Sequence, residues 1–198
     1  PYEIVYKPTL LTSDGIEKFF REANSDPECY GTIVWMHTFS PAKAWIKGLK
    51  IAEKPILHLH TQYNEALPFS TIDMDFMNEN QSAHGDREFG YIMTRMGIPR
   101  EIVVGHWSHE SVQKKIASWM TTAIGIVDTN KVRVVRIADN MRDVADTEGD
   151  KVDAALTFGW TIDAYPVNDI VKYVDEVSPA EIKTLTDEYY SKYTILLE

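Results

Sequence analysis

The runs Gly31-Thr32-Ile33-Val34-Trp35-Met36 and Pro55-Ile56-Leu57-His58-Leu59-His60 decide the fold class of this chain. Both have the apolar, partly β-branched centre that is typical of a buried strand. Between them, Pro41 stands where a helix can begin, and the helical pattern continues to Leu49. Strands that run in the same direction need a crossover connection, so two apolar strands joined by a helix predict a parallel β-α-β unit.

The same alternation of strand and helix extends along the chain. Thr12 and Ser13 can cap a helix over residues 16–23, and Ser178-Pro179-Ala180-Glu181 forms a capping box with proline at the first helical position. The pattern predicts an α/β protein with parallel sheets, in a three-layer αβα arrangement of the flavodoxin or Rossmann kind. The other elements that we expect are strands at residues 3–7, 101–107, 131–137 and 160–165, and helices at residues 72–96, 110–126, 149–158, 167–174 and 178–192.

A domain boundary is expected at the turn-forming residues Asp128-Thr129-Asn130, because a new β-α series follows them. The chain then consists of two partial domains, residues 1–130 and residues 131–198.

The composition is that of a folded, soluble protein, with 44% apolar and 25% charged residues among 198. The net charge of −10 argues against nucleic-acid and anionic membrane partners, since both require an excess of Lys and Arg. No apolar run approaches the roughly 20 residues of a membrane span, and the first residues do not resemble a signal peptide. The single cysteine, Cys29, cannot form an internal disulfide, so we expect a cytoplasmic protein.

Polar side chains recur where the expected strands end. They are His37 and Thr38, His60 and Gln62, His106 and Trp107, and Asp139 and Asn140. In open parallel sheets ligands bind beyond the carboxyl ends of the strands. The sequence therefore predicts a polar cleft of about the size of a sugar at this edge.

Two histidine pairs can be interpreted as metal ligands. His58-x-His60 puts both imidazoles on one face of a strand, and His106-x-x-His109 lies between a strand end and a helix start. Neither pair has a carboxylate at ligand spacing, so ordinary hydrogen bonding to neighbouring loops is the favoured interpretation.

His84 lies in the polar run Gln81-Ser82-Ala83-His84-Gly85-Asp86-Arg87-Glu88. The histidine can face a ligand and transfer a proton, or it can belong to a solvated helix face held by ion pairs. The residues alone leave both interpretations open.

Asp73, Asp75 and Glu79 can be an acid–base group or a hard-cation site, but acidic residues at a helix start more often complement the helix dipole. No glycine-rich phosphate loop and no nucleophile elbow occurs.

Several longer blocks resemble the L-arabinose isomerase family over nearly the whole chain. They are Trp35-Met36-His37-Thr38-Phe39-Ser40-Pro41-Ala42-Lys43, Leu57-His58-Leu59-His60-Thr61-Gln62, Thr71-Ile72-Asp73-Met74-Asp75-Phe76-Met77-Asn78, Asn80-Gln81-Ser82-Ala83-His84-Gly85-Asp86-Arg87-Glu88-Phe89-Gly90, Val103-Val104-Gly105-His106-Trp107, Asp139-Asn140-Met141-Arg142 and Thr147-Glu148-Gly149-Asp150-Lys151-Val152. Ala138 is a departure, because the family usually has glycine there.

The resemblance implies an aldose–ketose isomerase that converts L-arabinose to L-ribulose, and often D-galactose to D-tagatose, through an ene-diol with Mn²⁺ or a similar ion. It implies that two Glu and two His outside this chain hold the Mn²⁺, so that no metal ligand lies within it. Residues 1–130 would then be an N-terminal domain that lacks its first β-α unit, and residues 131–198 the start of a central domain. The family assembles as a trimer or a pair of trimers.

Three positions carry over by this resemblance, and a fourth residue is assigned beside them. His84 matches a histidine that points into the active site of a neighbouring subunit, and it is the expected catalytic residue. Phe39 and Met141 match an aromatic and an apolar residue of the substrate pocket, and Gln81 is assigned to the same pocket. Two other hypotheses remain: a non-catalytic sugar-binding or assembly module, and a metal hydrolase built on His58 and His60.

Overall fold

The computed structural model describes residues 3–36, 39, 41–138 and 140–196. The chain divides into two compact units, residues 1–129 and residues 130–198. Each is a parallel α/β unit, as the strand patterns predicted. None of the helices in the described ranges combines the length and the hydropathy that a bilayer crossing requires.

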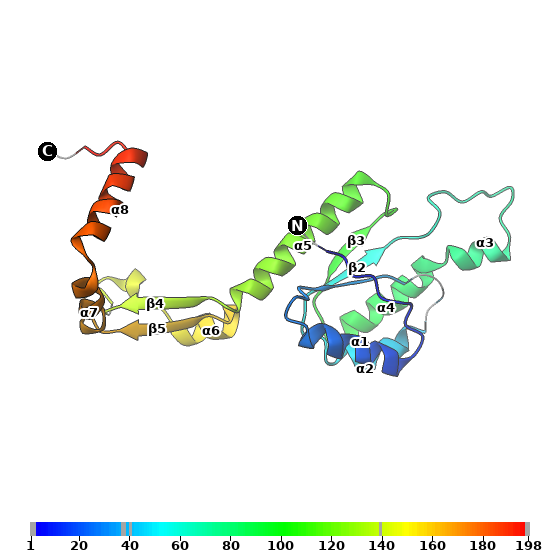
Figure 1. Cartoon of the computed structure of the whole chain (residues 1–198). Coiled ribbons are helices and arrows are strands. Elements are labelled where there is room, and N and C mark those ends of the chain that lie inside the picture. Colours follow the sequence, from blue (N-terminus) through cyan, green and yellow to red (C-terminus); the bar gives the residue numbers. More distant parts are fainter. Residues whose placement is uncertain (1–2, 37–38, 40, 139, 197–198) are drawn as a thin grey trace. The chain divides into compact units, whose positions relative to one another are not determined.

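The first unit is built on a three-stranded parallel sheet of order β1-β2-β3 (Figure 1). Its strands are β1 (Thr32–Val34), β2 (Ile56–His60) and β3 (Glu101–Val104). The central strand β2 pairs with both neighbours, with Val34 opposite His58 on one side and Val104 opposite His60 on the other. All three carboxyl ends therefore meet at one edge of the sheet.

One face of this sheet is covered by α1 (Ser13–Ser25), the short 3₁₀ helix η1 (Ala42–Trp45), α2 (Ile46–Leu49) and α4 (Ser82–Met96). The side chain of Thr12 caps α1 by accepting a hydrogen bond from the Gly15 amide, and the helix buries one apolar face. The core on this side consists of Ile16, Phe20, Val34, Met36, Ala42, Leu49, Ile56, Phe89 and Met93.

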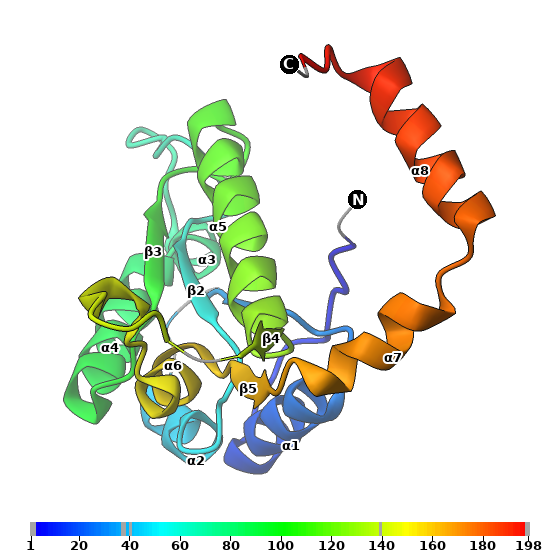
Figure 2. The same cartoon turned by 90° about the vertical axis from the view of Figure 1, so that its left-hand side faces the viewer.

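The other face is covered by α5 (Glu110–Thr129). Leu57, Val103 and Val112 are buried there, with Ile116 and Trp119 of α5 packed against them. Successive residues of a strand point to opposite faces, so Ile56 lies in the first core and Leu57 in the second. The first unit is thus a three-layer αβα sandwich (Figure 2).

Several expected elements differ in the structure. The strand expected over residues 101–107 ends at Val104. Residues 3–7 form no strand and are exposed. The expected helix over residues 41–49 begins as the 3₁₀ helix η1 before it becomes α2. The expected helix over residues 72–96 is two helices, α3 (Met74–Glu79) and α4, because Asn80 ends the first. Its side-chain amide donates to the carbonyl of Phe76, and its side-chain oxygen accepts from the amide of Asn64.

The second unit is a β-α-β unit followed by two helices. It contains β4 (Arg133–Ile137), η2 (Ala145–Thr147), α6 (Lys151–Phe158), β5 (Thr161–Tyr165), α7 (Asn168–Glu176) and α8 (Pro179–Lys192). The capping box of Ser178 and Glu181 is formed as predicted. No residue in the described ranges 130–138 and 140–196 is buried, because two strands with their helices enclose too little apolar surface for a core.

Candidate functional site

The structure brings together two of the predicted site residues, Phe39 and His84. His84 lies in the first turn of α4, where its amide donates to the carbonyl of Gln81, and Phe39 follows β1. Their ring centroids are 4.9 Å apart with the planes inclined by 42°. Both side chains are exposed, and Gln81 beside them is half-buried. The pair forms an aromatic and imidazole surface that is open to a ligand or to another subunit.

The helix α4 is fixed beneath His84 by residues on its other face. Gly85, Asp86 and Phe89 are buried, whereas His84 points outward. Asp86 Oδ1 lies 2.7 Å from Nε2 of His58, which is fully buried on β2. Glu88 accepts a hydrogen bond from the amide of Ala42, which begins η1. These contacts attach the turn that carries His84 to the sheet and to the segment after β1.

His58, His60 and Asp86 form a buried cluster with linked hydrogen bonds. His60 Nε2 lies 3.1 Å from His58 Nδ1, and His60 Nδ1 lies 3.9 Å from Asp86 Oδ2. Burial lowers the pKa of His60 below its usual 6.5, with a further lowering from His58 and Arg100, while Asp86 acts in the opposite direction. Both ring nitrogens of His58 therefore have partners within the chain.

A second cluster consists of Glu65, His106 and His109, in the loops that follow β2 and β3. His109 Nε2 lies 2.7 Å from Glu65 Oε1, and the ring centroids of His106 and His109 are 5.7 Å apart. The hydrogen bond from His109, and the positive charge of the two histidines, lower the pKa of the Glu65 carboxyl.

Each histidine pair has a carboxylate beside it in the folded chain, although none stands at ligand spacing in the sequence. Asp86 is 28 residues from His58, and Glu65 is 44 residues from His109. Spacing along the chain cannot reveal either partner, because the fold supplies both from other elements.

The structure also assigns Asp73 to the helix-dipole interpretation, since its side chain caps α3 by accepting a hydrogen bond from the Phe76 amide at 2.8 Å.

Met141 belongs to the second unit, so it is described with the residues of that unit alone. It lines a pocket of about 390 Å³ with Arg136, Asp146, Thr147, Gly149, Asp150, Lys151, Ala154 and Ile162. Asn140 accepts a hydrogen bond from Arg136 and donates one to Glu148 at 2.5 Å. His37, Thr38 and Asp139, which were also expected at strand ends, lie outside the described residues.

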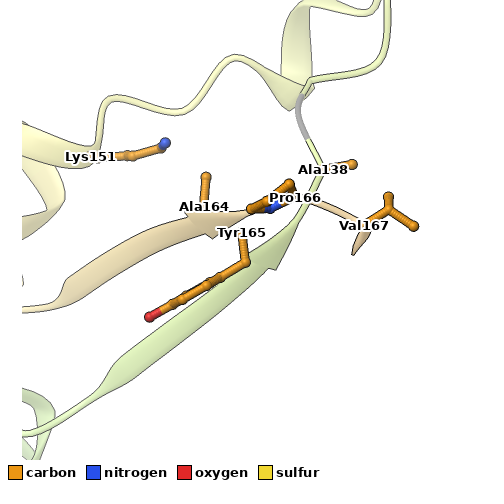
Figure 3. A pocket seen from close by; sticks show the side chains of 6 residues that line it. All are labelled: Ala138, Lys151, Ala164, Tyr165, Pro166 and Val167. Atoms are coloured by element: carbon orange, nitrogen blue, oxygen red, sulfur yellow. The ribbon is translucent and has the colours of Figure 1, made fainter. Parts of the chain in front are cut away.

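A second pocket, of about 540 Å³, opens at the carboxyl ends of β4 and β5 (Figure 3). Its lining residues are Ala138, Lys151, Ala164, Tyr165, Pro166 and Val167. Ala138 has φ = 66°, in the left-handed region that favours glycine. Because Ala138 is not glycine, this conformation places a strained residue at the rim of the pocket.

These features define a parallel α/β protein with polar and aromatic side chains beyond the carboxyl ends of its strands. Residues 1–131 match the family model of the L-arabinose isomerase N-terminal domain, and residues 133–198 match that of the L-arabinose isomerase central domain. The chain belongs to the L-arabinose isomerase family.

Close relatives carry the same name. The chain is 54% identical to the L-arabinose isomerase of Thermotoga maritima over 193 residues, 98% of this chain and 39% of the relative. It is 53% identical to the L-arabinose isomerase of Halalkalibacterium halodurans over 195 residues, which are 98% of this chain and 39% of the relative. It is 50% identical to that of Geobacillus stearothermophilus over 196 residues, which are 99% of this chain and 40% of the relative. The chain thus spans about two fifths of the length of the relatives it matches.

Proposed function

We propose that this chain is a segment of an aldose–ketose isomerase that converts L-arabinose to L-ribulose through an ene-diol. The segment supplies the aromatic and imidazole wall of the sugar site, and residues outside this chain hold the catalytic Mn²⁺. The observation that carries the proposal is the exposed pair of Phe39 and His84, in a chain that belongs to the L-arabinose isomerase family.

Each residue of the proposed wall has a distinct task. The exposed imidazole of His84 exchanges a proton with the sugar or with its ene-diol, which is a task suited to a histidine near neutral pH. Phe39 limits the positions of that ring and excludes water on one side of the sugar. Gln81 binds a sugar hydroxyl through its amide. Met141, which lies in the pocket of the second unit, is proposed as an apolar contact for a sugar by itself.

The bound Mn²⁺ would polarise the oxygens of the sugar. The cluster of His58, His60 and Asp86 does not fit this ion, because His58 is fully buried and both its ring nitrogens have partners. The cluster of Glu65, His106 and His109 offers a single carboxylate, whereas Mn²⁺ prefers sites rich in oxygen ligands. The proposal therefore leaves the catalytic metal to other parts of the protein.

The exposure of His84 supports an assembled enzyme, because an outward-facing imidazole can reach the site of another subunit. We propose a trimer or a pair of trimers in the cytoplasm, in which His84 of one subunit completes the sugar site of the next. D-galactose, which would give D-tagatose, is the second substrate to be assayed.

Two assays of L-ribulose formation test the proposal. In the first, this 198-residue chain alone receives L-arabinose and Mn²⁺, with and without a chelator. We expect no turnover, and chelator-sensitive turnover would contradict the assignment of the metal ligands to other residues. In the second, a chimera carries this chain in place of the matched 193 residues of the Thermotoga maritima relative. We expect chelator-sensitive turnover, whereas a folded but inactive chimera would favour a non-catalytic sugar-binding or assembly module.

A further inference from the structure

The cluster of Glu65, His106 and His109 takes no part in the proposed isomerase reaction. Glu65 comes from the loop after β2, His106 from the loop after β3, and His109 directly precedes α5. One ligand atom from each residue can be chosen so that all lie within 4.8 Å of one another. This is the edge of the sheet at which parallel α/β proteins bind ligands.

The spacing of these groups fits a small cation after a small rearrangement, in which the pair of Glu65 and His109 opens and wider separations close. Bonds of about 2.1 Å in a tetrahedral site place neighbouring ligand atoms about 3.4 Å apart. His109 Nε2 and Glu65 Oε1 are hydrogen-bonded at 2.7 Å, so these two atoms must move apart by about 0.7 Å to hold an ion together. The carbonyl oxygen of Tyr63 lies 3.2 Å from Nε2 of His106 and offers a further oxygen ligand.

His106 also has the outer partner that a metal-bound imidazole usually has. Its Nδ1 lies 2.7 Å from Oγ of Ser108 and accepts a hydrogen bond from the Ser108 amide at 3.4 Å, while Nε2 donates to the carbonyl of Tyr63. Binding of an ion at Nε2 would therefore move the ring proton to Nδ1, where Ser108 Oγ can accept it. Such a contact fixes the orientation of the ring and the choice of tautomer.

The loop that carries the two histidines is held by the sheet. The amide of Gly105 donates to the carbonyl of His60, and the amide of Trp107 donates to the buried side chain of Thr61 at 2.9 Å. The amide of His109 donates to the carbonyl of His106, which closes a turn between the two ligands. A site on such a fixed turn loses little entropy when an ion binds.

We propose that Glu65, His106 and His109 bind a divalent transition-metal ion of the Zn²⁺ class, with the Tyr63 carbonyl or water completing the shell. Two imidazoles with one carboxylate are the ligand set that Zn²⁺, Ni²⁺ and Cu²⁺ favour over Mn²⁺. The site is accessible, since Glu65 and His109 are exposed, and in this it differs from the buried cluster of His58, His60 and Asp86. It also departs from the sequence-based prediction that no metal ligand lies in this chain, because that prediction did not include Glu65.

Calorimetric titration of the chelator-treated 198-residue chain with Zn²⁺ tests the site. We expect one ion per chain, and a loss of affinity of about tenfold or more in His109→Ala and in Glu65→Gln. Both side chains are exposed, so these variants keep the fold. The ring resonances of His106 and His109 should shift on addition of Zn²⁺ in NMR spectra.

His60→Gln is the matched control, since it removes an imidazole from the buried cluster alone. Its affinity for Zn²⁺ should equal that of the unchanged chain. Absence of Zn²⁺ binding, binding that survives both Glu65→Gln and His109→Ala, or binding that is lost in His60→Gln would each overturn the proposal.

Discussion

The ring of Phe39 packs against the ring of His84 with a centroid separation of 4.9 Å, although 45 residues separate the two in the sequence. Phe39 follows β1, whereas His84 lies in the first turn of α4. The contact connects two segments at the edge of the sheet where its strands end. His84 remains exposed in this contact, so its ring nitrogens can exchange a proton with a donor or acceptor.

Removal of the Phe39 ring should weaken the site more than the fold. The side chain is 61% exposed, so Phe39→Ala should change the free energy of unfolding little. The lost ring contact is worth about 1 kcal/mol, which corresponds to a loss of about fivefold in kcat/KM of the chimera. Phe69→Ala, at a residue that is 83% exposed, is the control and should keep full activity. Equal activity of the two variants would contradict a role for Phe39 in the sugar site.

Asp86 should matter for stability because it is the buried partner of His58. Asp86→Ala leaves a fully buried imidazole without one of its hydrogen-bond partners, and such losses cost about 1–3 kcal/mol. Urea unfolding, followed by the fluorescence of tryptophan, measures the difference. Asp75→Ala, on the exposed side of α3, should cost less than about 0.5 kcal/mol. A cost below about 1 kcal/mol for Asp86→Ala would show that the pair contributes little.

His60 should make the stability of the first unit depend on pH. Its folded-state pKa lies below the usual 6.5, so under mildly acidic conditions the unfolded chain binds a proton that the folded chain does not. Above pH 6.5 His60 is neutral in both states and does not reduce the free energy of unfolding. As the pH falls from 6.5 toward the lowered pKa, the unfolded chain takes up a proton and the free energy of unfolding decreases. Unfolding free energies measured between about pH 5 and 7 should decrease less steeply in His60→Gln. An unchanged slope would show that other groups cause the dependence.

Two helical glycines should respond to alanine with opposite signs. A Cβ at Gly48 of α2 would lie 2.7 Å from Ile16 Cγ2 and 2.8 Å from Phe20 Cδ2, so Gly48→Ala should destabilise by about 1–3 kcal/mol. At Gly125 of α5, no heavy atom of the described chain lies within 4 Å of the Cβ position. Gly125→Ala should therefore stabilise by about 0.5–1 kcal/mol. Thermal unfolding of both variants checks the two signs, and a common sign would contradict the packing of α2 on α1.

The sequence predicts those parts of the fold that are determined by residues close together in the chain. The apolar runs of β1 and β2 indicate buried parallel strands, and Ser178 with Glu181 marks the start of α8 by direct contact. Residues 3–7 have a strand-like pattern, but a strand also needs a neighbour, which the described chain does not offer them. The break between α3 and α4 depends on the contact of Asn80 with Asn64, 16 residues away.

The candidate site divides in the same way. His84, Phe39, Gln81 and Met141 are found through long sequence blocks that resemble a known family, and periodicity alone left the role of His84 open. The partners Asp86 and Glu65 were missed, because each reaches its histidine only through the packing of separate elements.

The most direct test of the account is the turnover of L-arabinose by the chimera with and without His84→Ala. If His84 transfers a proton, kcat should decrease by about 10²–10⁴-fold, while the Mn²⁺ concentration that gives half-maximal activity stays the same. Turnover at the unchanged rate would contradict the assignment of His84 to the isomerase site.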